Sequence, residues 1–167
     1  MRKTWPGRGA LLAAGAATVA GMLASCSSGG APASVPSRAR AYAVVDACLL
    51  TGPRGIFDPA AAPVWAGMED VSVTGQVRAS YLEVPDPVTP GSALSHLNSL
   101  IVQKCALIIA VGGPERTAVL AEARRFSAVR FVVLGAAGPV PPNVDDLAFT
   151  TAGTRAAVAG AVRAVVG

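Results

Sequence analysis

Histidine, aromatic residues and charged residues are all scarce in this chain of 167 residues. His96 is the single histidine, aromatic residues make up 5% of the sequence and charged residues 14%. His96 has no Cys, His, Asp or Glu partner at ligand spacing, so we expect a surface or helix-face histidine rather than a metal ligand. No Ser/His/Asp or Cys/His arrangement supports nucleophilic catalysis. The sequence therefore predicts no catalytic residue, no cofactor and no metal site, and it favours a protein that is not an enzyme.

Phosphate-binding motifs and a basic surface are also missing. Gly112 and Gly113 precede a predicted helix and could hold an anion, but no G-x-G-x-x-G or G-x-x-x-x-G-K-[ST] pattern surrounds them, which favours a tight turn. The net charge of +4 depends on the N-terminus, because removing residues 1–25 leaves 11 of the 14 basic residues against 10 acidic ones. We therefore expect no nucleic-acid binding. The adjacent pairs Glu69-Asp70 and Asp145-Asp146 are interpreted as solvated ends of elements.

The N-terminus has the composition of an export signal. Arg2, Lys3 and Arg8 precede an uncharged run over residues 9–24, which is short for a membrane-spanning helix. The run ends in Leu23-Ala24-Ser25-Cys26, which resembles the lipobox of bacterial lipoproteins, whose cysteine is acylated and becomes the mature N-terminus. A signal peptide with a chance cysteine is the alternative. We expect a signal over residues 1–25, lipidation of Cys26, and a protein anchored at the extracytoplasmic face of the cell membrane.

A Ser/Gly/Pro/Ala-rich stretch over residues 26–40 predicts a flexible tether, and the remaining residues 41–167 predict one α/β lobe. Within this lobe Cys48 and Cys105 would be exported to an oxidising compartment, where pairing is expected. Both cysteines lie near the amino ends of the first and third predicted strands, which are neighbours in a doubly wound sheet. A disulfide is therefore predicted, with two buried thiols as the alternative.

Hydrophobic patterns alternate between strand and helix along the lobe. We expect strands over 41–50, within 71–84, and over 106–112, 130–135 and 147–151. Helices are expected within 59–71 and over 91–103, 113–126 and 153–166, with Ser92 as the N-cap of the second. This order predicts a doubly wound, mainly parallel sheet, in which the loops over 51–58, 112–114 and 135–138 share the ligand-binding edge.

Three motifs carry a resemblance to a known family. They are Cys105-Ala-Leu-Ile-Ile-Ala-Val-Gly112, Arg130-Phe-Val-Val-Leu134, and the segment 143–151 that enters a helix. In their order and spacing, residues 44–166 resemble the amino-terminal lobe of the basic membrane protein family, the lipoprotein nucleoside-binding components of ABC importers. The resemblance implies a single lobe of a periplasmic-binding-protein-like fold, with an ABC permease as a partner.

The chain departs from this family where the family contacts its nucleoside. Family members follow the first strand with an acidic residue, a Gly-Gly-Ile turn and Ser-Phe-Asn at the next helix. This chain has Thr51-Gly52, Arg54-Gly55-Ile56 and three alanines over 60–62 instead, although Asp58 remains. Phe57 could stack on a ligand, but covering the core is the preferred interpretation. The residues of these loops that could still contact a ligand are the following: Thr51, Gly52, Arg54, Phe57, Asp58, Gly112 and Gly113.

The second departure is length, since a solute is normally clamped between two lobes and this sequence has material for one. We therefore expect a membrane-anchored lipoprotein that resembles a truncated, degenerate substrate-binding component and binds a small solute weakly. An envelope interaction module without a small-molecule ligand is the alternative, its partner being another envelope protein or a permease.

Overall fold

The computed structural model describes residues 45–166, except residues 75, 136–137 and 151. The chain divides into two units, Met1–Ser37 and Arg38–Gly167, and the described residues all belong to the second. The predicted signal, the predicted tether, Cys26 and residues 41–44 lie outside the described residues.

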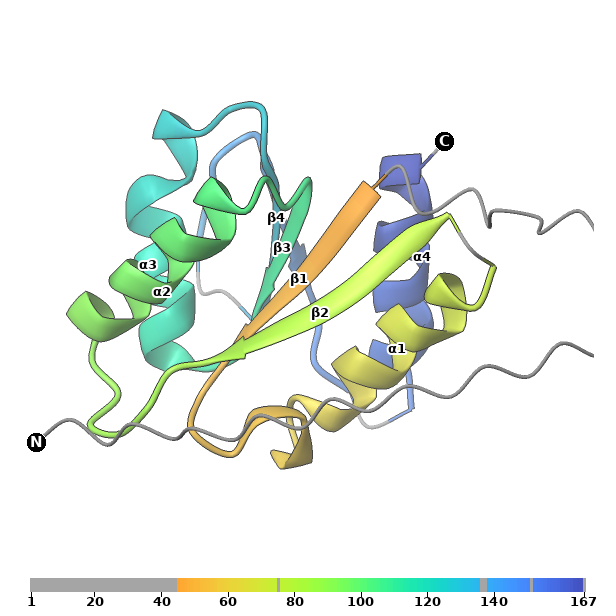
Figure 1. Ribbon diagram of the computed structural model, residues 1–167, viewed down its shortest axis with the longest axis horizontal. Helices are drawn as coiled ribbons and strands as arrows, with labels where there is room; N and C mark the ends of the chain where they lie inside the picture. Colours follow the sequence, from red (N-terminus) through yellow and green to blue (C-terminus); the bar gives the residue numbers. More distant parts are fainter. Residues whose placement is uncertain (1–44, 75, 136–137, 151, 167) are drawn as a thin grey trace, which may run out of the picture. The chain divides into compact units, whose positions relative to one another are not determined.

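Five parallel strands form one sheet in the order β2-β1-β3-β4-β5 (Figure 1). The strands are β1 (Val45–Thr51), β2 (Val77–Glu83), β3 (Leu107–Ala110), β4 (Arg130–Leu134) and β5 (Val144–Leu147). The helices are α1 (Ala62–Ser72), α2 (Pro90–Val102), α3 (Gly113–Glu122) and α4 (Thr154–Val166), with the short 3-10 helices η1 (Gly55–Phe57) and η2 (Ala123–Arg125). The doubly wound parallel α/β fold expected from the sequence is confirmed.

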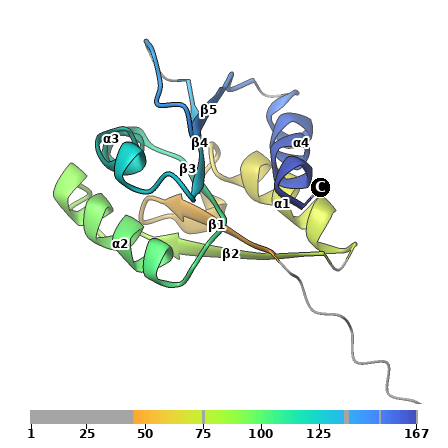
Figure 2. The same cartoon turned by 90° about the horizontal axis from the view of Figure 1, so that it is seen from above.

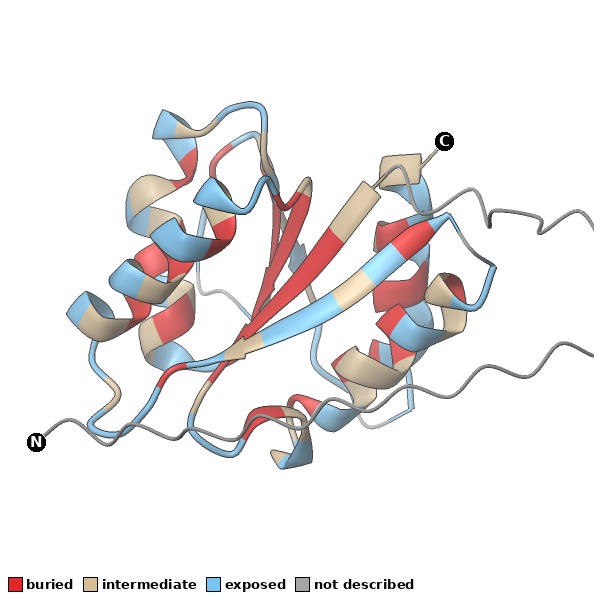
Figure 3. Ribbon diagram, viewed as in Figure 1, coloured by how far each residue is buried: buried red, intermediate tan, exposed pale blue. Residues whose placement is uncertain are grey.

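Each face of the sheet carries its own hydrophobic core. Cys48 and Leu50 of β1 pack in the core beneath α2 and α3, whereas Ala47 and Leu49 pack in the core beneath α1 and α4. Figure 2 shows the two helix pairs on opposite sides of the sheet. The central strands are buried along nearly all of their length (Figure 3), as expected for strands covered on both faces. Because residues 45–166 contain both cores, the unit Arg38–Gly167 can fold without the preceding residues.

The last strand differs from its prediction. We expected it over 147–151, but β5 covers Val144–Leu147 and includes Asp145 and Asp146, which are therefore not at the end of an element. The strand forms there because Val144 pairs with Phe131 of β4, and an edge strand can keep its carboxylates in water. Asp145 accepts a hydrogen bond of 2.8 Å from Arg130.

The N-cap of α2 also differs from its prediction. Thr89 is the N-cap, and its hydroxyl accepts a hydrogen bond of 3.1 Å from the N–H of Ser92. The Ser92 hydroxyl in turn accepts a hydrogen bond of 2.9 Å from the N–H of Thr89. Because of this reciprocal capping box, the helix starts at Pro90. Proline is tolerated there because the N–H of the first helical residue has no partner within the helix.

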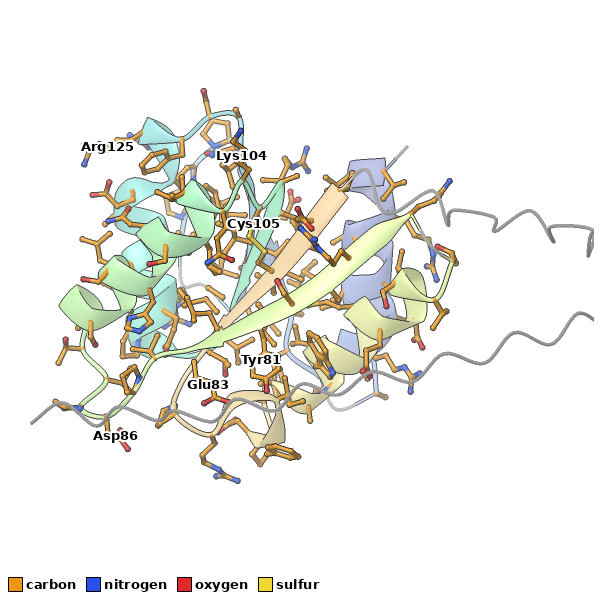
Figure 4. All side chains as sticks on the ribbon, in the orientation of Figure 1. Tyr81, Glu83, Asp86, Lys104, Cys105 and Arg125 are labelled. Carbon is orange, nitrogen blue, oxygen red and sulfur yellow. A yellow bond between two sulfur atoms is a disulfide. The ribbon has the colours of Figure 1, made fainter. Side chains whose placement is uncertain are left out.

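The predicted disulfide between Cys48 and Cys105 is present. It joins two positions 57 residues apart in sequence, with a Cα–Cα distance of 6.0 Å, and both residues are buried in the core beneath α2 and α3. Cys105 lies just before β3, next to α2 (Figure 4), whereas Cys48 lies in the middle of β1 rather than near its amino end. The bond connects β1 to the chain just before β3.

Candidate functional site

The sheet changes winding direction between β1 and β3. The chain leaves β1 toward α1 on one face and leaves β3 toward α3 on the other face (Figure 2). The two loops therefore diverge at the carboxyl ends of adjacent strands, which is where ligands bind in open α/β sheets. A hollow of about 210 Å³ lies at this position. It is lined by Thr51, Gly52, Asp58, Ala60, Val88, Val111, Gly112, Pro114 and Glu115.

The loop after β1 is held by short-range hydrogen bonds. Thr51 is buried at the end of β1, and its hydroxyl donates to the carbonyl of Gly55 at 3.4 Å. Gly55 has a φ of 56°, and a Cβ there would collide with the carboxylate of Glu83, which Figure 4 shows at the end of β2 beside this loop. The positive φ favours glycine at this position of the turn.

The structure brings together four of the seven candidate residues around the hollow: Thr51, Gly52, Asp58 and Gly112. Asp58 accepts a hydrogen bond of 2.9 Å from the N–H of Ala60, which fixes its carboxylate at the approach to α1. Arg54 does not line the hollow and lies 3.9 Å from the Asp58 carboxylate with an exposed guanidinium. Gly113, the first residue of α3, also lies outside the lining.

Phe57 neither lines the hollow nor covers the core. It is 81% exposed, so the expectation that it covers the core is wrong. The reason is local, because η1 is a single turn in which Gly55 is buried while Ile56 packs against the core, and Phe57 follows on the outer side.

Glu115 is the site residue that the sequence analysis missed. It lies in the first turn of α3, is only 1% exposed, and its carboxyl borders the hollow. In the part of the chain that the structure describes, Oε1 of Glu115 has no hydrogen-bond partner. A buried polar atom without a partner is unusual in a folded protein and points to a functional role or a ligand.

Two glycines leave room for this carboxyl. Gly112 has a φ of 119°, and a Cβ on it would collide with Oε2 of Glu115. On the other side, a Cβ on Gly52 would stand 3.7 Å from Oε1. The Glu115 carboxyl therefore lies between the backbones that follow β1 and β3. One sequence signal was available, since Glu115 shares a helical stripe with the buried residues Ala118 and Val119.

The electrostatics of the hollow oppose ionisation of Glu115. Burial raises the pKa of the Glu115 carboxyl, its own backbone N–H partly offsets this rise by donating to the carboxylate, and the negative charge of Asp58 raises the pKa further. Of the described residues that line the hollow, none is basic. The site thus holds two acidic groups against apolar walls.

A larger hollow of about 630 Å³ lies at the opposite edge of the sheet, beside the amino end of β4. Arg130 there is bonded to Asp145, and the Asn143 amide donates to the carbonyls of Ala123, Phe126 and Val129. These polar groups serve the fold itself, so this hollow is a weaker candidate for a ligand site.

Other candidate features remain isolated. His96 lies on α2, where its Nδ1 is 2.8 Å from the carbonyl oxygen of Ser92. Within the described ranges no three His, Cys, Asp or Glu side chains are grouped so that they could hold a metal ion. No helix among the described residues is long and apolar enough to span a membrane.

Comparisons with known proteins place the chain by its fold. No family model matches the sequence, and no curated protein matches it. A crystal structure of a fragment described as a lipoprotein, from Peptoclostridium difficile 630, superposes with a TM-score of 0.63 at 13% identity, covering 74% of this chain and 99% of that one. A solute-binding protein of an ABC transporter system from Aeropyrum pernix K1 gives a TM-score of 0.50 at 17% identity. That match covers 61% of this chain and 28% of the solute-binding protein, so the shared fold amounts to about one lobe.

Proposed function

We propose that this chain is a lipid-anchored, extracytoplasmic protein of the solute-binding type, which presents one lobe and binds a small solute at the hollow between β1 and β3. The observation that carries the proposal is the buried, unpartnered Glu115 carboxyl at the winding switch of the sheet. The shared fold with a solute-binding protein and with a described lipoprotein supports it. The proposal includes no catalytic step.

The proposal keeps the relation to the amino-terminal lobe of the basic membrane protein family but not the family's nucleoside. Of the described residues that line the hollow, none is aromatic, and Ala60 stands where the family has a hydrogen-bonding side chain. A volume of about 210 Å³ is also below the roughly 300 to 1,000 Å³ that is typical for pockets of drug-sized ligands. The small volume and the lack of an aromatic side chain in the described lining favour a solute smaller than a nucleoside.

Amide chemical-shift mapping of residues 38–167 tests solute binding directly. Adenosine, guanosine, inosine and uridine are expected to bind with dissociation constants of about 1 mM or weaker, because the stacking face and matched polar groups are missing. A pool of smaller amines, alcohols, amides and carboxylates is expected to contain a compound that shifts Gly52 and Gly112. A nucleoside that binds below about 10 μM would contradict this interpretation of the hollow.

Anchoring is tested through Cys26. The Cys26→Ala variant should lose acylation and either leave the membrane fraction or keep its signal uncleaved, because the cysteine is the acyl acceptor at the predicted lipobox. The Ser25→Ala variant, which keeps a small residue before the cysteine, is the matched control and should be processed like the wild type. Normal acylation and cleavage of the Cys26→Ala protein would refute the anchor.

An envelope interaction module is the second candidate, and one observation favours it. Phe57 is 81% exposed beside Asp58, so an aromatic side chain stands in solvent next to the candidate site. Aromatic side chains are enriched at protein interfaces. If no solute in the screen shifts the amides at the hollow, this candidate replaces the first.

A further inference from the structure

We propose that the hollow selects a small organic cation with a primary ammonium group, and that the Glu115 carboxylate is its main partner. This inference rests on the proposed function, since it assigns the chemical class of the solute at the same hollow. Three features of the described residues carry it: the free carboxylate oxygen, the sign of the charges around it, and the size and apolar character of the walls.

The carboxylate oxygen is placed to receive a donor. Oε1 of Glu115 is buried, lacks a hydrogen-bond partner and borders the hollow. Gly52 has no side chain to stand against this oxygen, since a Cβ there would lie 3.7 Å from Oε1. An ammonium group offers three N–H donors, so it can satisfy the oxygen with a charge-assisted hydrogen bond.

The charges favour a cation over an anion or a neutral solute. Asp58 and Glu115 both line the hollow, and the charge of Asp58 raises the pKa of Glu115, so a positive ligand relieves repulsion that the unliganded site contains. Arg54 approaches Asp58 from outside at 3.9 Å but does not line the hollow. The positive end of α3 does not favour an anion here, because the Glu115 carboxylate already accepts from its own backbone N–H.

The walls limit the rest of the ligand. The apolar part of the lining consists of Ala60, Val88, Val111 and Pro114, which suits a short alkyl chain. The hollow lies below the size range of most small-molecule pockets, and the described lining contains no aromatic cage of the kind that recognises quaternary ammonium groups. A primary alkylammonium ion with a chain of a few carbons fits both limits.

Titration of residues 38–167 with n-butylammonium chloride at pH 8 tests the inference, with 1-butanol as the neutral probe of the same heavy-atom count. We expect saturable shifts of the Gly52, Gly112 and Glu115 amides and a dissociation constant for the ammonium at least about tenfold below that of the alcohol. Equal concentrations of sodium chloride and of sodium butyrate control for ionic strength and for an anion of similar size.

Variants distinguish the contribution of the Glu115 carboxylate to binding from that of the cavity. Glu115→Gln keeps the side-chain volume and should remove the preference for the ammonium over the alcohol. Glu122→Gln, on the same helix but bonded to the exposed Arg125 at 2.8 Å, should leave that preference unchanged. Gly52→Ala adds a methyl group beside Oε1 and should weaken the binding of both probes.

The outcomes distinguish this inference from the proposed function. If n-butylammonium binds no better than 1-butanol, or if Glu115→Gln keeps the preference, the cation assignment is wrong. If another class of solute shifts the same amides in that case, the solute-binding function stands without it. If no solute of any class shifts them, both the inference and the proposed function fail.

Discussion

Glu115 places a buried carboxyl group where no basic side chain of the described lining compensates its charge. It is buried to 1% exposure between the loops that follow β1 and β3, while every other residue of α3 with comparable burial is apolar. Such a group lowers stability when it ionises, because the folded protein solvates the charge less well than water does. This unfavourable burial of an ionisable group lies at the candidate site, and ionisable groups with shifted pKa values are typical of functional sites.

Stability should therefore depend on pH through Glu115. Its pKa is raised in the folded state, so the stabilisation that protonation provides is fully present below the unfolded pKa and is lost as the pH rises through the folded pKa. Glu115→Gln cannot suffer this loss. The unfolding free energy of Glu115→Gln, relative to that of the wild type, should therefore increase as the pH rises from about 4 to about 8.

Urea unfolding of residues 38–167 at pH 4, 6 and 8 measures this difference. Glu122→Gln removes a carboxylate from the same helix at its surface and serves as the control. Asp58 faces Glu115 from the loop after β1, and Arg116, the next residue of α3, instead donates to the carbonyl of Gly135 at 2.8 Å. Identical pH profiles for the two glutamine variants would contradict the burial of an ionisable Glu115.

The sequence predicted part of this site and missed its central residue. Thr51, Gly52, Asp58 and Gly112 could be placed because the carboxyl ends of parallel strands meet at one edge. Glu115 was not among the predicted site residues. Its burial depends on a Gly112 backbone with positive φ and on the neighbouring Gly52, and neither relation follows from local sequence.

The helices α1 and α4 pack closely at Gly67. A Cβ on Gly67 would collide with the carbonyl oxygen of Arg155 and would lie 3.1 Å from the Cβ of Val158. The contact is reinforced by Arg155, which donates two hydrogen bonds of 2.7 and 2.6 Å to the Asp70 carboxylate. The absence of a side chain at Gly67 thus sets the distance between these two helices.

A pair of glycine substitutions tests this packing. Gly67→Ala should destabilise the lobe by about 1–3 kcal/mol, because the methyl group forces the α4 backbone away. Gly160→Ala, in the exposed part of α4 with nothing within 4 Å of the new Cβ, should stabilise it by about 0.5–1 kcal/mol through helix propensity. Denaturant midpoints measure both effects, and a stabilising Gly67→Ala would show that the helices are not in close contact.

Sequence patterns predicted the buried elements better than the edge elements. The runs that became β1, β3 and β4 were evident, because strands covered on both faces are continuously apolar. β5 was misplaced because its Asp145 and Asp146 resemble a loop, and only pairing with β4 makes them a strand. The N-cap of α2 was predicted at Ser92 but lies at Thr89. Both residues are good caps, and the proline between them decides where the helix starts.

The disulfide links β1 to the residues just before β3. Cys48 and Cys105 close a loop of 57 residues, and both sulfur atoms lie in the core beneath α2 and α3. Cross-linking restricts the unfolded chain more strongly than the folded one. The bond therefore stabilises the connection between the first half of the lobe and the second.

Reduction should lower the unfolding free energy by about 4 kcal/mol, the value that the chain-entropy relation gives for a loop of this length. Urea unfolding with and without dithiothreitol measures the effect. Thiol titration of residues 38–167, unfolded without reductant, should detect no free thiol. Two titratable thiols would mean that the cysteines are not bonded in the isolated protein.

The order of the strands also bears on when the sheet can form during synthesis. All four neighbouring pairs are parallel, so no hairpin is available to start the sheet, and each pairing must wait for a connecting segment. β1 gains its second neighbour only after β3 has emerged, and sheets that depend on such distant contacts fold more slowly than helical bundles. The sheet therefore cannot close until the later strands β3, β4 and β5 have been synthesised.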